Sequence, residues 1–221
     1  MKTYSEYRAA ARQTLGDRWN EAALVFFLIT LIAALFSGPN ACGSLFHWSN
    51  AFSNAWSGLY LAAAILLIMP LQAVFSIIML RWVRGSEERL LESTWNTFLH
   101  KFEHVVVPMA LEIVIIVAIS VVTLCIGGII FAFAYAMVPF VLEDHPEMSA
   151  REVLRTSREM MRGHKWELFI LELSYIGWIL LCIITLGVAT FWVEPWMTTA
   201  MAHFYEDIRP QAAEEVTPVA E

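Results

Sequence analysis

The segment REVLRTSREMMRGHK at residues 151–165 is followed by WELFILELSYIGWILLCIITLGVATFWVEPWMTTAMAHFY at residues 166–205. The first segment carries five Lys and Arg residues, and the second carries none. The apolar segment is long enough to cross a bilayer twice, because about 20 helical residues span a hydrocarbon core of ~30 Å. Basic segments stay on the cytoplasmic side of a membrane. The two segments together therefore predict a cytoplasmic helix followed by a transmembrane hairpin.

The same alternation of basic and apolar segments extends through the whole chain. All 14 Lys and Arg residues fall into four clusters, at residues 2–18, 81–101, 151–165 and 209, which three apolar stretches separate. The chain is 58% hydrophobic and 16% charged, whereas a soluble domain has about a quarter of its residues charged. We therefore predict an all-α polytopic membrane protein with six transmembrane helices arranged as three hairpins. Each hairpin is preceded by a cytoplasmic amphipathic helix, and both termini are expected in the cytoplasm.

The apolar stretches also give boundaries for the six helices. The predicted spans occupy residues 20–37, 58–80, 105–124, 128–142, 166–184 and 188–205. With the cytoplasmic helices they form a single membrane domain over residues 1–209. Gly38-Pro39-Asn40 is expected to end the first span, and residues 38–57 to form an outer loop. The small, acidic segment 210–221 is predicted to be disordered.

Short polar motifs mark the starts of the predicted cytoplasmic helices. Thr3 with Glu6, and Ser149 with Glu152, have the spacing of a capping box. In this motif the two side chains bond each other's backbone N–H groups and fix the first turn of a helix. Ser86 is the expected N-cap of the second cytoplasmic helix, over residues 86–102.

Three carboxylates, Glu112, Glu172 and Glu194, lie inside the predicted spans. A charge at the centre of a bilayer costs about 2.5–3.5 kcal/mol on insertion scales, so such groups usually face protein or water and often serve function. The alternative is that the three carboxyls are protonated or hydrogen-bonded and only fix helix packing. Glu112 and Glu172 are expected nearer the inner surface and Glu194 nearer the outer one, which argues against one site shared by all three.

Two threonines extend this polar set. Thr190, Glu194 and Thr198 recur at every fourth position, which places them on one helix face. Pro195 adjoins them, and a proline frees a backbone carbonyl one turn earlier in a helix. Such groups can hold a cation or relay a proton. The candidates for an ion or proton path are Glu112, Glu172, Glu194, Thr190 and Thr198.

The third cytoplasmic helix concentrates positive charge. Its candidate binding residues are Arg151, Arg158, Arg162 and Lys165. Our leading hypothesis is a non-catalytic membrane protein that binds anionic lipid headgroups or another membrane protein through its cytoplasmic helices. The alternative function is a small transporter or channel that uses Glu194 with Glu112 or Glu172. The helix itself also has a simpler interpretation, a solvated segment that only follows the positive-inside distribution.

Motifs for catalysis or cofactor binding are not found in the sequence. It has no nucleophile elbow, P-loop, HExxH or paired CxxC pattern, so we predict no catalytic residues, no cofactor and no metal site. The protein is not expected to be an enzyme, although an intramembrane enzyme built from scattered residues stays open. The net charge of −7 gives no reason to expect a nucleic-acid partner.

The last third of the chain carries motifs of a known family. They read MVPF at 137–140, REMMRGHKW at 158–166, SYIGW at 174–178 and FYED at 204–207. With these motifs the chain resembles a bacterial integral-membrane family known as domain of unknown function 975. The resemblance implies a multi-pass protein of the bacterial cytoplasmic (inner) membrane with no settled activity. The family is also distantly similar to the membrane domain of some glycerophosphodiester phosphodiesterases, which is not their catalytic part. The outer loop at residues 38–57 departs from typical members.

Overall fold

The computed structural model describes residues 2–46, 50–86, 89–100, 102–122 and 126–216. Within them all regular secondary structure is helical, which confirms the all-α class. The helices are α1 (Tyr4–Leu15), α2 (Trp19–Phe46), α3 (Asn50–Ala63), α4 (Met69–Val83), α5 (Leu90–His100), α6 (Phe102–Val122), α7 (Ile126–Tyr135), α8 (Val138–Asp144), α9 (Ala150–Met160), α10 (Lys165–Leu173), α11 (Ile176–Ile184) and α12 (Thr190–Val216). A 3₁₀ turn joins α1 to α2, and one π-helical turn, Ala64–Ile68, joins α3 to α4.

Several of these helices are long and apolar enough to cross a membrane. By length and composition, the described residues contain two such stretches, Tyr4–Leu35 and Ser57–Val83. Helices α10 and α11 would supply a third if they form one span, bent by 43°. These stretches coincide with the first, second and fifth of the predicted spans. The chain thus has the apolar helices of a membrane protein.

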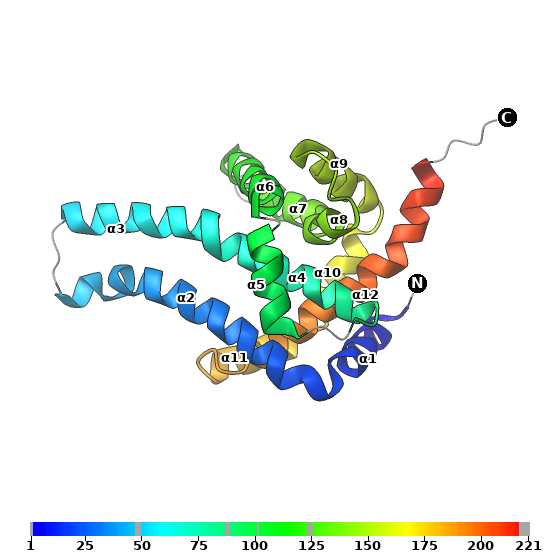
Figure 1. Ribbon diagram of the computed structural model, residues 1–221, viewed down its shortest axis with the longest axis horizontal. Coiled ribbons are helices and arrows are strands. Elements are labelled where there is room, and N and C mark those ends of the chain that lie inside the picture. Colours follow the sequence, from blue (N-terminus) through cyan, green and yellow to red (C-terminus); the bar gives the residue numbers. More distant parts are fainter. Residues whose placement is uncertain (1, 47–49, 87–88, 101, 123–125, 217–221) are drawn as a thin grey trace.

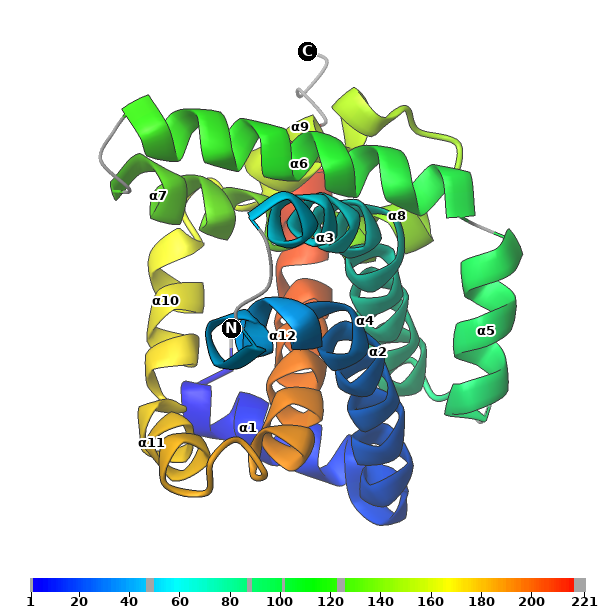
Figure 2. The same cartoon turned by 90° about the vertical axis from the view of Figure 1, so that its left-hand side faces the viewer.

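The helices pack around α12 rather than forming one parallel bundle. Helix α12 contacts α1, α2 and α4 in the middle of the molecule. Helices α2 and α3 lie side by side and project from the rest of the chain (Figure 1). Figure 2 views this pair from its end, and there α6 lies across it. The long helices therefore run in different directions, which decides which side chains meet in the interior.

Two predicted boundaries in α2 and α3 are wrong. Helix α2 continues past Gly38-Pro39-Asn40 to Phe46, and much of the expected outer loop belongs to α3. A proline inside a helix costs one backbone hydrogen bond. Continuing an existing helix is nevertheless much easier than starting a new one, which favours helical backbone on both sides of the proline. Residues 47–49 of the predicted loop lie outside the described residues.

The predicted disorder from Pro210 is also wrong for its first part. Helix α12 extends to Val216, and residues 217–221 lie outside the described residues. Adding a residue to an existing helix is much easier than starting a new one. The long α12 therefore carries its backbone hydrogen bonding into a segment whose composition alone suggests disorder.

Local capping signals are confirmed where the partners are close in sequence. The backbone N–H of Thr3 donates to Glu6 Oε2 at 2.6 Å, and that of Ser149 donates to Glu152 Oε2 at 2.8 Å. Ser86, in contrast, does not cap α5. That helix starts at Leu90, whose N–H donates at 2.7 Å to Glu21 in α2. A carboxylate at a helix N-terminus is favourable because it pairs with unbonded N–H groups there.

Two of the predicted spans are interrupted. The span at 128–142 is divided into α7 and α8, and α8 begins just before Pro139, as expected for a residue without an N–H donor. The span at 166–184 bends between α10 and α11. There the carbonyl of Ser174 accepts a hydrogen bond of 2.9 Å from the Arg8 guanidinium in α1. A bend leaves carbonyls unpaired, and this contact supplies one missing donor.

Candidate functional site

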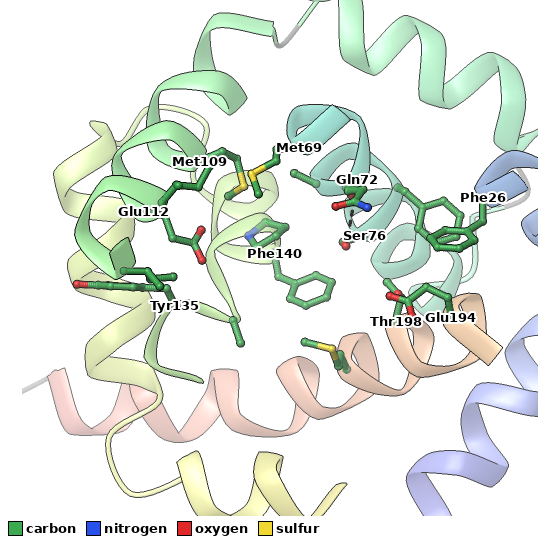
Figure 3. A pocket seen from close by; sticks show the side chains of 17 residues that line it. Phe26, Met69, Gln72, Ser76, Met109, Glu112, Tyr135, Phe140, Glu194 and Thr198 are labelled. Atoms are coloured by element: carbon green, nitrogen blue, oxygen red, sulfur yellow. Dashed lines mark hydrogen bonds between the residues drawn. The ribbon is translucent and has the colours of Figure 1, made fainter. Parts of the chain in front are cut away.

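A cavity of about 370 Å³ lies between α4, α6, α8 and α12 (Figure 3). Its volume is within the range of about 300–1,000 Å³ that is typical of small-molecule sites. The polar lining residues are Gln72, Ser76, Glu112, Tyr135, Glu194 and Thr198. Most of the remaining lining is apolar, including Phe26, Phe75, Phe140, Met69, Met109 and Met201. An apolar pocket with a few convergent polar groups is the usual form of a binding site.

Helical spacing explains how three helices line this cavity. Gln72 and Ser76 are four residues apart on α4, and Glu194 and Thr198 are four residues apart on α12. Side chains at this spacing lie above one another on the same helix face. On α6, Glu112 shares a face with Met109 and Ile116. Each helix therefore turns one mixed polar and apolar stripe toward the same space.

The two carboxylates enter the cavity from opposite ends. Figure 3 shows Glu112 at the end beside Tyr135, and Glu194 at the other end beside Thr198 and Phe26. Phe140 and Ser76 lie between them in this view. Neither carboxylate has a hydrogen bond or an ion pair with another described residue. The acidic groups therefore face the cavity without a partner from the described protein.

Thr198 adds a second unpartnered oxygen at the Glu194 end. Its side chain is only 8% exposed, and its hydroxyl makes no hydrogen bond to a described residue. Its neighbour Thr199, by contrast, donates to the Pro195 carbonyl at 2.7 Å. Because Thr198 lines the cavity, this hydroxyl is available to a ligand or a water molecule there.

Three of the five predicted path residues line this cavity and two do not. Glu112, Glu194 and Thr198 come together. Glu172 lies on α10 and Thr190 at the start of α12, and neither lines the cavity. The three carboxylates do not share one site, but two of them do. The expected depths assume helices perpendicular to the membrane plane, and α6 does not run parallel to the α2–α3 pair (Figure 2).

Sequence reasoning missed Gln72, Ser76 and Tyr135. A signal for the first two was present, because they are polar, four residues apart, and follow Pro70 in an otherwise apolar helix. The Ser76 hydroxyl donates at 3.2 Å to the backbone carbonyl of Gln72. No local signal marks Tyr135, because its role depends on which helices surround it.

A second, shallower site lies along the basic helix α9. Arg151, Arg155 and Arg158 line an open groove together with Leu111 and Tyr135. Arg158 lies 5.6 Å from the centre of the Phe131 ring, a cation–π distance. Two other predicted binding residues, Arg162 and Lys165, do not line this groove. Tyr135 lines both the groove and the cavity and is therefore shared by the two spaces.

Paired charges join the ends of α4 and α8 to the middle of α12. Arg84, just after α4, contacts Asp144 at the end of α8 and, at 2.6 Å, Glu206 within α12. The Tyr205 hydroxyl donates to Asp144 at 2.7 Å, and the Tyr7 hydroxyl of α1 donates to Asp207 at 2.9 Å. The FYED motif at 204–207 therefore holds helix ends together. These charges are satisfied within the protein, which makes them a structural cluster.

An aromatic cluster docks α1 on the rest of the chain. The Arg12 guanidinium lies 4.2 Å from the centre of the Trp196 ring, and the Trp196 indole N–H donates to the Arg8 carbonyl at 2.9 Å. Tyr175 and Trp178 pack edge-on against Trp196, with ring centres 4.9 and 5.2 Å away. The SYIGW motif at 174–178 thus also has a packing role.

Apolar helices that enclose a cavity lined by two half-buried carboxylates define an all-helical protein with the composition of membrane proteins. The sequence model of the family described as "Protein of unknown function (DUF975)" matches residues 103–212. The chain belongs to this family. No curated protein and no solved structure matches the chain. The distant similarity to the membrane domain of glycerophosphodiester phosphodiesterases stays a prediction.

Proposed function

We propose that this protein is a small transporter that takes up a cationic solute through Glu112 and Glu194. The observation that carries the proposal is that these two carboxylates, from helices far apart in sequence, face one cavity without a protein partner. An ionised carboxylate away from water is costly unless a cation compensates it. A bound cation would supply the missing partner at each end of the cavity.

The proposed setting is the bacterial cytoplasmic membrane. We place the chain there as six spans in three hairpins with both termini in the cytoplasm. The grouping of all Lys and Arg residues into four clusters supports this arrangement, as do the long apolar stretches. In this orientation the basic helix α9 and its groove face the cytoplasm.

Transport also requires access to the cavity from more than one side. Met69 and Gln72 line the cavity and are exposed, Met69 by 38%, which favours an opening beside them. On another side, Tyr135 lines both the cavity and the groove along α9, which favours a second opening past its ring. We propose that the solute passes between these two openings. No chemical step is required, so the proposed protein is not an enzyme.

Glu103 supplies a matched control for the test, because it is an exposed carboxylate at the start of α6 and does not line the cavity. We would measure uptake of Na⁺, K⁺, methylammonium and an alkyl diamine into proteoliposomes. Glu112→Gln and Glu194→Gln should each abolish uptake of the transported cation, whereas Glu103→Gln should retain it. The proposal fails if no cation is taken up, or if all three variants behave alike.

Lipid binding by α9 is a second candidate function. Arg151, Arg155 and Arg158 line one groove, and all three are exposed. Clusters of basic side chains near a membrane surface attract anionic headgroups, at about 1 kcal/mol for each Lys or Arg. Reversing the charge of Arg151, Arg158, Arg162 and Lys165 should abolish capture on vesicles that contain anionic lipid. Unchanged capture would leave α9 as a solvated helix.

A further inference from the structure

The distribution of charge in the cavity limits the kind of cation that fits. Glu112 and Glu194 do not converge, because they enter from opposite ends (Figure 3). Between them Figure 3 shows Met69 and Phe140 together with Gln72 and Ser76. The cavity therefore offers two separate negative ends and a middle that is apolar on the side of Met69 and Phe140. The inference below rests on the proposed function, since it names the class of solute that this cavity takes.

A small inorganic cation does not match this pattern. Mg²⁺ and Ca²⁺ require six or more oxygen ligands converging at about 2.0–2.6 Å. Among the described residues, no group of three His, Cys, Asp or Glu side chains lies close enough to hold a metal. A single ion at one carboxylate would also leave the other one without a partner.

A linear molecule with a positive charge at each end matches the pattern better. Each terminal ammonium would form a charge-assisted hydrogen bond with one carboxylate, and such bonds are stronger than neutral ones. The hydrocarbon chain between the ammonium groups would lie along Phe140 and the Met side chains, where apolar contact is favourable. One ligand would then satisfy both ends and the middle of the cavity.

Thr198 completes the site at the Glu194 end. An ammonium group has three N–H donors and no acceptor, so it requires more than one oxygen. The Thr198 side chain lines the cavity, makes no hydrogen bond to a described residue, and lies beside Glu194. It can accept a second hydrogen bond from the same ammonium.

We propose that the solute is a linear aliphatic diamine, bound end to end between Glu112 and Glu194. This arrangement predicts dependence on chain length, because a shorter diamine reaches only one carboxylate and a longer one must bend. It also predicts that both amines are needed, because a monoamine leaves one carboxylate uncompensated.

The test is a binding series on the full-length protein in detergent, measured by calorimetry. The ligands are diamines from 1,3-diaminopropane to 1,8-diaminooctane and the monoamines of equal chain length. We expect one optimum length, at which the diamine binds about tenfold or more tightly than its monoamine, as for one added charge-assisted contact. These wild-type comparisons do not depend on whether a variant folds.

Variants then assign the two ends. Glu112→Gln and Glu194→Gln should each lower diamine affinity to that of the monoamine, and Thr198→Val should lower it by less. Glu103→Gln, at an exposed carboxylate outside the cavity, should leave it unchanged. Equal affinity for diamine and monoamine would overturn the diamine assignment while leaving cation uptake through the cavity intact. Cation uptake that depends on both carboxylates, in a protein that binds no amine, would also overturn the diamine assignment. If neither amine binding nor carboxylate-dependent cation uptake is observed, the proposed function fails as well.

Discussion

Arg84 and Asp144 form a two-pronged ion pair, with Nη1 to Oδ1 at 2.6 Å and Nη2 to Oδ2 at 2.9 Å. The pair links the end of α4 to the end of α8. The Asp144 side chain is only 7% exposed, whereas that of Arg84 is 31% exposed. Tyr205 and Arg209 of α12 contact the same carboxylate. Three helices that line the cavity are thus joined at one set of charges.

Breaking this pair should destabilise the fold. Removing one partner of a buried ion pair costs about 3–5 kcal/mol, and exposed pairs contribute about 1 kcal/mol or less. For Arg84→Gln, which leaves Asp144 mostly buried, we expect a loss of about 2 kcal/mol. Thermal unfolding in detergent measures the effect. Arg155→Gln is the control, because its pair with Glu159 is exposed and should contribute about 0.5 kcal/mol or less. Equal losses would show that the buried pair has no special role.

The same carboxylate makes stability depend on pH. Burial disfavours the ionised form of Asp144, but the hydrogen bonds from Arg84 and Tyr205 outweigh burial and lower its pKa below the ordinary value of 3.8. This contribution to stability is complete above the ordinary pKa and is lost as the pH falls through the lower folded value. Unfolding measured from neutral pH to about pH 3 should therefore show a steeper acid loss for the wild type than for Asp144→Asn. Identical slopes would mean that other carboxyls control the acid transition.

The sequence alone predicts where a helix starts when the residues that cap it are close together along the chain. Thr3 with Glu6, and Ser149 with Glu152, form the expected capping boxes because both partners lie within one helical turn. The start of α5 could not be predicted in this way. It depends on Glu21, which is distant in sequence and reaches Leu90 only after the fold has formed.

Prediction of the cavity from the sequence is limited in the same way, because its residues meet only in the folded chain. The free-energy cost of placing a charge inside a membrane was enough to single out Glu112, Glu172 and Glu194 as candidate functional residues. This cost could not show that Glu112 and Glu194 line one cavity and that Glu172 does not. That outcome depends on the direction of α6 relative to its neighbours (Figure 2), and the apolar pattern of α6 contains no information on direction.

The proposed orientation predicts which turns are accessible from outside the cell. Leu186 is 95% exposed in the turn between α11 and α12, and Arg162 is exposed just after α9. Cysteine would be introduced at each position in a chain lacking Cys42, Cys125 and Cys182. An impermeant maleimide on intact cells should label Leu186→Cys and should label Arg162→Cys only after permeabilisation. The reverse pattern would contradict both termini lying in the cytoplasm.

Tyr135 offers the last prediction, because it lines both the cavity and the groove along α9 and its ring is the proposed barrier between them. The side chain is buried and lies beside Glu112 in Figure 3. Tyr135→Ala should join the two spaces, so that a small thiol reagent applied from the α9 side reaches Glu112→Cys several-fold faster. Inside-out vesicles present that side to the reagent.

Phe133→Ala is the matched control, since Phe133 lies on the same helix α7, packs against Phe169 of α10 and lines neither space. The labelling rate at Leu186→Cys should stay constant in both backgrounds, which separates local opening from general loosening of the fold. If Tyr135→Ala leaves the reactivity at position 112 unchanged, the aromatic ring is not the barrier. The route between cavity and cytoplasm would then have to pass elsewhere, and the transporter proposal would lose its inner opening.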